Sequence, residues 1–222
     1  MIEARELIKH YGARRVLDRA SLKIASGECV VLTGDNGSGK TTLLHVLVGM
    51  RGADGGHVLW KDERLTGRGR KAWRRARAAW GFLPQQVFLP PHARVGHLLQ
   101  FHTRLRGASV QRARHWLERV GLTGSEDQRV GALSGGMRQR LATALVFFHE
   151  PELIVMDEPR SNLDPTWRTA LVEWVGEATA RGAGVLVTSQ LRRGWPPDAR
   201  YRRCEGGRVL EPEHGGEEEA AE

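Results

Sequence analysis

Cysteine, lysine and long apolar runs are all scarce in this chain. Its two cysteines, Cys29 and Cys204, have neither a CxxC nor a metal-ligand spacing, which argues against a disulfide staple and fits a reducing cytosol. Cys29 opens an apolar stretch and is expected to be a small core residue. No run approaches the roughly 18 apolar residues of a membrane-spanning helix, and residues 1–6 lack the pattern of a signal peptide. If the protein works at a membrane, we expect another chain to hold it there.

The formal net charge of +8 is unevenly distributed. Seven basic residues lie close together: Arg64, Arg68, Arg70, Lys71, Arg74, Arg75 and Arg77. This basic cluster is interpreted either as a surface for anionic lipid, nucleic acid or a partner subunit, or as a solvated arginine-rich face. Only Trp73 and Trp80 lie in or beside it, which is too sparse for base stacking, so no direct nucleic-acid contact is expected. The last ten residues, 213–222, hold five glutamates and predict an acidic, disordered tail.

The chain's length of 222 residues and its 40% hydrophobic content suit one domain with an inserted subdomain. β-type stretches are predicted at 5–9, 20–24, 29–33, 57–61 and 80–83, with a helix over 64–79. Helices without intervening strands follow, at 94–105 and 110–120. Strand and helix then alternate, with helices at 137–148 and 166–180 and strands at 153–156 and 185–188. This alternation indicates a largely parallel sheet flanked by helices.

A phosphate-loop pattern, G-x-x-x-x-G-K-[ST], runs from Gly34 to Thr41, between the apolar stretch 29–33 and a helix-favouring run. Glycines allow the backbone N–H groups to surround a phosphate, and the following helix N-terminus favours negative charge. Lys40 is expected to reach the terminal phosphates of a nucleotide, and the Thr41 hydroxyl to hold a magnesium ion. The whole candidate nucleotide-binding stretch is Gly34, Asn36, Gly37, Ser38, Gly39, Lys40, Thr41 and Thr42.

A second pair of candidate functional residues, Asp157 and Glu158, directly follows the apolar stretch 153–156. Ligands of parallel sheets bind at the carboxyl ends of the strands, so both carboxylates are expected near the phosphate loop. Asp157 is predicted to hold the magnesium ion, and Glu158 to act as general base on the attacking water.

A second anion-binding helix N-terminus is predicted where Ser134, Gly135 and Gly136 open an amphipathic helix. Two phosphate-binding helix N-termini are unexpected in a chain that works alone. They are expected if the second one binds the nucleotide held by another subunit.

These features, in this order, resemble the ATP-binding cassette (ABC) ATPases over about residues 2 to 210. The loop 34–41 matches Walker A, residues 156–159 the end of Walker B, and 133–136 the signature motif. Residues 161–164, Ser161 to Asp164, match the D-loop. Gln85 matches a glutamine that contacts magnesium and water in the family, with Gln86 as an adjacent competitor, and Tyr11 matches an aromatic that stacks on adenine. Asp164 followed by Pro165 also has a plain structural interpretation, as a helix N-cap with proline at the first helical position.

The resemblance implies a phosphate-loop α/β fold with a mainly parallel sheet, an N-terminal antiparallel β subdomain and an inserted helical subdomain. Residues 1–212 would form one ATPase domain, with 1–86 and 131–212 as its core and 87–130 as the helical part. It also implies ATP and Mg²⁺ as cofactors and a head-to-tail homodimer or pair with a second cassette. ATP-driven closure would power a transmembrane permease through contacts near the Gln85 loop, from the inner face of the cell membrane.

The sequence departs from the family where the last core strand, 185–189, leads to Gln190 in place of a histidine. A glutamine amide can donate a hydrogen bond but cannot carry the charge of a protonated imidazole. Residues 191–197 contain two prolines, which predict that the helix expected here is short or absent. Weak or partner-dependent turnover is therefore one alternative to an autonomous ATPase.

A short single cassette best resembles the ATPase subunit of a bacterial exporter, such as those linked to maturation of cytochromes c or of nitrous oxide reductase. The other alternative is a soluble cassette ATPase that acts as an assembly scaffold. Nothing in the sequence identifies a transported substrate, because the cassette is not expected to touch it.

Overall fold

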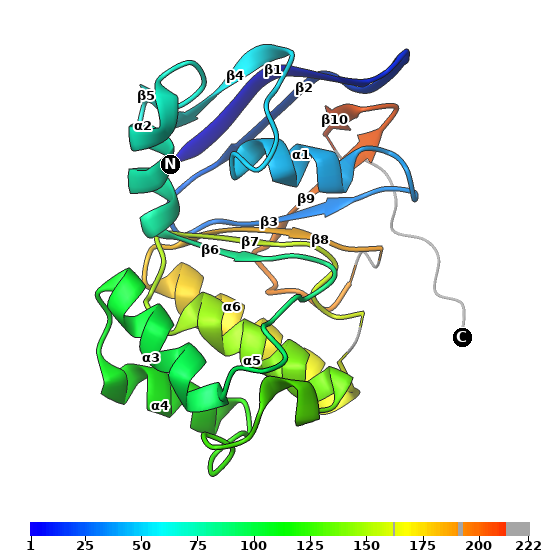
Figure 1. Ribbon diagram of the computed structural model, residues 1–222. Coiled ribbons are helices and arrows are strands. Elements are labelled where there is room, and N and C mark those ends of the chain that lie inside the picture. Colours follow the sequence, from blue (N-terminus) through cyan, green and yellow to red (C-terminus); the bar gives the residue numbers. More distant parts are fainter. Residues whose placement is uncertain (162, 191–192, 212–222) are drawn as a thin grey trace, which may run out of the picture.

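The computed structural model describes residues 1–161, 163–190 and 193–211 (Figure 1). The predicted acidic tail, Asn162 of the D-loop match, and Leu191 and Arg192 lie outside the described residues. Two sheets and six α-helices, with one 3₁₀ turn at Val130–Ala132, make up this part of the chain. No helix in it is both long and apolar enough to cross a membrane.

The larger sheet has the strand order β10-β9-β3-β8-β7-β6. Its strands are β3 (Cys29–Thr33), β6 (Trp80–Leu83), β7 (Leu153–Met156), β8 (Gly184–Thr188), β9 (Arg200–Glu205) and β10 (Arg208–Leu210). All neighbours pair in parallel except β9 and β10, which form an antiparallel hairpin at the edge. Strands β3, β7 and β8 are buried along their whole length, which explains their near-continuous apolar sequences. The predicted mainly parallel sheet is confirmed.

A smaller antiparallel sheet, ordered β2-β1-β4-β5, lies beside it. Its strands are β1 (Ile2–Tyr11), β2 (Arg14–Ile24), β4 (Gly55–Trp60) and β5 (Glu63–Arg64). Helix α1 (Lys40–Leu47) lies between the two sheets (Figure 1), where Leu43, Leu44 and Leu47 are buried in one apolar cluster with residues of both. The predicted N-terminal antiparallel unit is therefore present.

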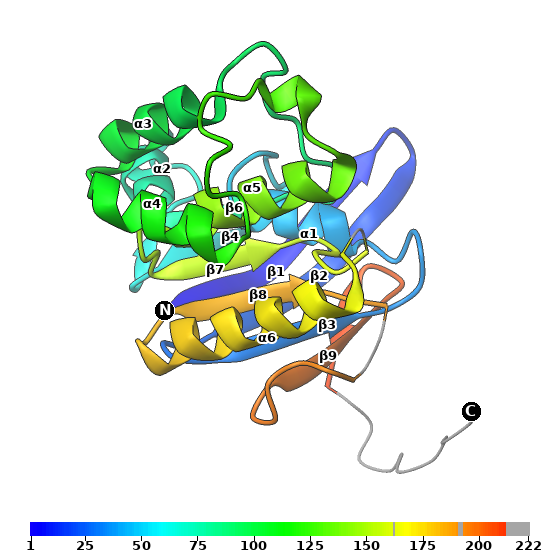
Figure 2. The same ribbon diagram turned by 90° about the horizontal axis from the view of Figure 1, so that it is seen from below.

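The other face of the larger sheet is covered by α5 (Gly135–Phe147), which packs against β6, and α6 (Pro165–Ala180), which packs against β8 (Figure 2). Helices α3 (Val95–Arg106) and α4 (Val110–Arg119) lie beyond α5 (Figure 1), within the predicted helical segment 87–130. A second apolar cluster joins these helices to the sheet. Cys29 belongs to it, as predicted, and burial raises the pKa of its thiol to about 12.

Three sequence predictions need correction. The helix predicted over 64–79 is α2 (Gly69–Ala78), because Arg64 pairs in β5 and the chain turns at Gly67 and Gly69, both with positive φ. Strands β1 and β2 are longer than predicted. Strands β9 and β10 were not predicted at all, because their arginine-rich sequences have no clear alternation of apolar and polar residues. Residues 193–199 contain no helix, as the two prolines indicate.

Candidate nucleotide-binding site

The phosphate loop connects β3 to α1 in a backbone conformation that its glycines permit. Gly34, Gly37 and Gly39 have φ of 143°, 81° and 110°. A Cβ at Gly34 would lie 2.2 Å from the carbonyl oxygen of Cys204, and one at Gly39 would lie 2.8 Å from that of Val16. Only glycine satisfies both the dihedral angle and the close approach at these two positions.

Lys40 is the first residue of α1, and its side chain folds back over the loop. Its Nζ donates to the carbonyl oxygens of Gly34, at 2.5 Å, and Asp35, at 3.1 Å. The hydroxyl oxygen of Ser38 is buried and has no hydrogen-bond partner among the described residues. A buried cation at a helix N-terminus suits a phosphate group, whereas Ser38, also predicted to bind the nucleotide, is not among the residues that line the cavity above the loop.

A cavity of about 470 Å³ opens above this loop and brings together most of the predicted site. The predicted residues that line it are Tyr11, Asn36, Gly37, Gly39, Lys40, Thr41, Thr42, Gln85, Asp157, Glu158 and Gln190. Gln85 lines the cavity and the competing Gln86 does not. Gly34 lines an adjoining hollow together with Asn36 and Gln190. The side-chain amide of Gln190 donates a hydrogen bond to Asn36 Oδ1 at 3.4 Å. Residues separated by more than 150 positions thus meet at one edge of the sheet.

Asp157 and Glu158 follow β7 and are fixed by the hydroxyl of Thr188, at the end of β8. This hydroxyl donates to Asp157 Oδ1 at 2.6 Å and accepts from the backbone N–H of Glu158 at 2.8 Å. The other carboxylate oxygen of Asp157 is buried with no partner in the part of the chain that the structure describes. An unpaired buried carboxylate oxygen beside a cavity fits a divalent cation or its water shell, so these residues suit the implied magnesium ion.

Glu158 has its backbone in the left-handed region, with φ of 46°. The bond to Thr188 and the Ser161 hydroxyl, which donates to the Glu158 carbonyl at 2.9 Å, hold it there. Burial is the largest influence on its pKa and raises it above the ordinary value. Asp157 raises this pKa further, while Lys40 and a backbone hydrogen bond from Gln190 lower it. A carboxyl group with a raised pKa in a cavity is suited to accept a proton.

The structure does not bring Ser134, Gly135, Gly136 or Asp164 into this cavity. Ser134 is the N-cap of α5, where its hydroxyl accepts from the N–H of Met137 at 3.2 Å. Asp164 is the N-cap of α6, where its carboxylate accepts from the N–H of Trp167 at 3.1 Å, with Pro165 following. The structural interpretation of Asp164 and Pro165 is confirmed. Ser134 and Gly135 are exposed, so the start of α5 is accessible to another molecule.

Several residues at this site were missed by the sequence analysis. Arg14 and Val16 on β2 line the cavity, and Thr188 supports its two carboxylates. The β9–β10 hairpin braces the loop: the Cys204 thiol donates to the Ser38 carbonyl at 3.2 Å, and the Gly207 N–H donates to the same oxygen at 3.1 Å. Burial raises the pKa of Cys204, which keeps the thiol protonated as a donor. Of these missed residues, only Thr188 had a sequence feature that could have indicated a role in the site, because it is a polar residue at the end of an apolar strand.

The fold and the site define a phosphate-loop NTPase with an added antiparallel sheet. Residues 17–161 match the family model described as ABC transporter. The chain is 36% identical over 194 residues to Nod factor export ATP-binding protein I of Burkholderia orbicola (strain AU 1054), covering 86% of this chain and 62% of the relative. It is 37% identical, with the same coverage, to the protein of that name from Paraburkholderia xenovorans (strain LB400).

Solved structures show the same fold. An ATP-binding subunit of an ABC transporter superposes with a TM-score of 0.86 at 25% identity, covering 94% of this chain and 88% of that one. A dimeric bacterial ABC transporter cassette also has a TM-score of 0.86, at 23% identity, covering 94% and 96%.

The chain belongs to the ABC transporter family and contains its ATP-binding cassette. ATP-binding domains of this family bind ATP and are ATPases. The chain spans 62% of the length of the two curated relatives. Both relatives are named for Nod factor export, and neither name mentions the maturation of cytochromes c or of nitrous oxide reductase.

Proposed function

We propose that this chain hydrolyses ATP with Mg²⁺ and uses the cycle to drive a transmembrane permease that exports a substrate. The observation that carries this proposal is the meeting of Lys40, Thr41, Asp157 and Glu158 in one cavity at the carboxyl edge of a parallel sheet. They lie at the start of α1 and directly after β7, and they supply a phosphate-binding cation, two magnesium-compatible oxygens and a base.

Each residue has a distinct role in this proposal. Lys40 leaves its two carbonyl acceptors to bind the terminal phosphates, and Tyr11, which is half-exposed at the rim, stacks on adenine. Thr41, Gln85 and Asp157 would hold a magnesium ion, which neutralises charge on the phosphate oxygens when bound. Glu158 accepts a proton from the attacking water, and Gln190 donates a hydrogen bond to the departing phosphate.

The cassette is proposed to act as a homodimer or with a second cassette. The exposed start of α5, with Ser134, Gly135 and Gly136, would face the nucleotide held by the partner subunit, and Asp164 would lie at the same interface. Phe88, which follows the Gln85 loop and is 87% exposed, and Phe101 on α3 are apolar side chains that a permease would cover. The permease would keep the cassette at the inner face of the membrane.

The first test is Mg²⁺-dependent release of phosphate from ATP by the purified chain and by Lys40→Ala. Loss of the ammonium removes the phosphate contact, so we expect ATP binding to weaken and turnover to fall by at least about 10²-fold. Lys23→Ala is a matched control, since Lys23 is an exposed lysine that does not line this cavity, and it should leave turnover unchanged. A parent chain that neither binds nor hydrolyses ATP would refute the proposal.

With glutamine at position 190, we expect a lower rate of ATP turnover than with histidine at the same position. Removing a well-aimed donor from a transition-state oxygen costs about 10²–10³ in rate, and Gln190 retains a donor without the positive charge. We expect Gln190→His to raise kcat at saturating ATP several-fold, and Gln190→Ala to lower it. An unchanged kcat in Gln190→His would count against the role of residue 190. The alternative of a nucleotide-gated subunit with weak turnover would be favoured by ATP-dependent dimerisation without hydrolysis in the parent chain.

A further inference from the structure

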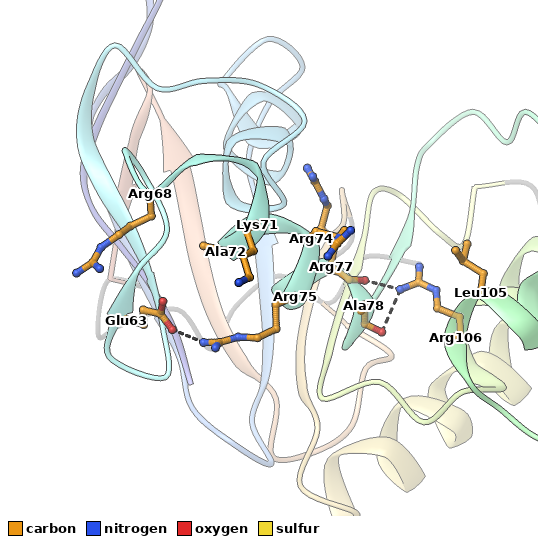
Figure 3. A pocket seen from close by; sticks show the side chains of 10 residues that line it. All are labelled: Glu63, Arg68, Lys71, Ala72, Arg74, Arg75, Arg77, Ala78, Leu105 and Arg106. Atoms are coloured by element: carbon orange, nitrogen blue, oxygen red, sulfur yellow. Dashed lines mark hydrogen bonds and ion pairs between the residues drawn. The ribbon is translucent and has the colours of Figure 1, made fainter.

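Several arginines of this chain hold separate segments together by donating to backbone carbonyls. Arg106 of α3 is one of them, and it donates to the carbonyls of Arg77 and Ala78 at the end of α2 (Figure 3). It lines a cavity of about 860 Å³ together with five residues of the basic cluster: Arg68, Lys71, Arg74, Arg75 and Arg77. This cavity shares no residue with the nucleotide-binding cavity. Arg160 makes contacts of the same kind beside the nucleotide-binding site, because it follows Glu158 and Pro159 in the chain.

The side chain of Arg160 connects the loop after β7 to the segment that follows Gln190. Its Nη1 donates to the carbonyl oxygens of Arg193, at 3.2 Å, and Gly194, at 3.0 Å. The guanidinium carbon lies 5.4 Å from the ring centroid of Trp195, which is buried in the apolar cluster between the larger sheet and the helices. Gly194 leaves room for this contact, since its φ is 81° and a Cβ there would lie 2.9 Å from Nη1. One side chain therefore contacts three successive residues.

The backbone of Arg160 is itself held in place. Its carbonyl oxygen accepts from Nε of Arg168 on α6 at 3.2 Å and from the N–H of Leu163 at 3.3 Å. Burial lowers the pKa of Arg160, and Arg168 lowers it further, but a guanidinium remains charged. No carboxylate in the described part of the chain pairs with this half-buried cation. Such an arrangement is a costly way to stabilise a loop, which indicates a role beyond folding.

Gln190 lies between two anchored parts of the backbone. Before it, at the end of β8, the N–H of Ser189 donates to a carbonyl oxygen of β3 at 3.1 Å. After it, the chain is anchored at the two carbonyls that Arg160 binds, and residues 193–199 contain no helix that could fix this segment instead. The bond from the Gln190 amide to Asn36 is long, at 3.4 Å. The direction of the amide therefore depends on the backbone that carries it.

We propose that Arg160 is a positioning residue for Gln190, and that it keeps the Gln190 amide directed at the phosphate released during hydrolysis. Without the guanidinium, the segment after Gln190 would gain conformational freedom, and the amide would occupy its productive orientation for less of the time. Arg160 does not line the nucleotide-binding cavity, so it acts through Gln190 and not on the nucleotide. This inference rests on the proposed function, because it assigns Arg160 a role in the same reaction.

The test compares Arg160→Ala with Arg160→Lys in the purified chain. We expect Arg160→Ala to lower kcat for phosphate release by about tenfold, with the Kd for ATP within about twofold of the parent, because only the orientation of the amide changes. Lysine keeps a donor but cannot stack on Trp195 as a planar group, so kcat of Arg160→Lys should be intermediate. Hydrogen exchange measured by mass spectrometry should be faster over residues 186–199 in Arg160→Ala, and unchanged over the phosphate loop.

Two controls separate positioning from general stability. Arg119→Ala removes contacts of the same kind at another place, since the Arg119 guanidinium lies 4.6 Å from the Trp116 ring centroid and donates to Glu177 at 2.7 and 2.6 Å. Its kcat should stay within about twofold of the parent. In a Gln190→Ala background, Arg160→Ala should lower kcat by no more than about twofold, because the group that it positions is already gone.

Three results would overturn the role of Arg160: a tenfold loss of kcat in both backgrounds, an equal loss in Arg119→Ala, or an Arg160→Ala variant with parental kcat or parental hydrogen exchange. A parent chain without ATP turnover would instead refute the proposed function, and the positioning role with it. Turnover in the parent therefore distinguishes the two failures, since only the role of Arg160 falls when the parent is active and Arg160→Ala equals it.

Discussion

Replacing Glu158 by glutamine is expected to lower ATP turnover by about 10³-fold while leaving ATP binding intact. General bases contribute about 10²–10⁴ to rate, and the amide keeps the size and hydrogen bonding of the side chain but cannot accept the proton. The backbone contacts that hold residue 158, to Thr188 and Ser161, do not involve its carboxylate and should persist. The measurements are kcat from phosphate release and the Kd for ATP. The trapped nucleotide should also favour the dimer, which size-exclusion chromatography with ATP detects.

The same assignment predicts a direction for the pH dependence. Burial and Asp157 raise the pKa of Glu158. As the solution is acidified, this carboxylate therefore becomes protonated at a higher pH than an ordinary glutamate does. The turnover should therefore increase as the pH rises through this raised pKa and level off above it. Because the ionised form is disfavoured in the folded state, this group also makes folding less favourable above its unfolded pKa, with the penalty fully developed above the folded pKa. A turnover that rises as the medium becomes more acidic, or a Glu158→Gln variant with parental kcat, would contradict the role of Glu158 as base.

Thr188→Val is expected to reduce both stability and turnover, although residue 188 contacts no nucleotide in the proposed mechanism. Valine keeps the shape of the side chain but leaves Asp157 Oδ1 without its 2.6 Å donor and the Glu158 N–H without its 2.8 Å acceptor. Each unsatisfied buried group costs about 1–3 kcal/mol, so the loss of both bonds should lower the free energy of unfolding by about 2–6 kcal/mol. We expect kcat to fall by about 10²-fold, because small displacements of catalytic groups cost rates of this order.

Thr188→Ser is the matched control, because it retains the hydroxyl and removes one methyl group. Its turnover should stay within a few-fold of the parent, whereas its stability should decrease by about 1 kcal/mol. Chemical denaturation and kcat measurements on both variants separate the two effects. If valine and serine lowered kcat equally, the hydroxyl bridge would not be what positions Asp157 and Glu158.

The sequence alone determined those parts of the site that are contiguous in the chain. The phosphate loop from Gly34 to Thr41 depends on local glycine dihedrals and a helix start, and the Asp157–Glu158 pair on the end of a buried strand. These are local properties, so their residues could be named before the fold was known. The alternation of strand and helix likewise predicted the parallel sheet, because a strand buried on both faces leaves a continuous apolar run.

Only the tertiary structure decided which distant residues support these motifs. The Thr188 bridge to Asp157 spans 31 positions, and the Cys204 contact with the Ser38 carbonyl spans 166. The edge hairpin that brings Cys204 there has an arginine-rich sequence without clear alternation. Arg106 of α3 likewise reaches the carbonyls of Arg77 and Ala78 at the end of α2 only in the folded chain. Such contacts depend on how strands are ordered and helices packed, which is a property of the whole chain, so no local pattern of residues encodes them.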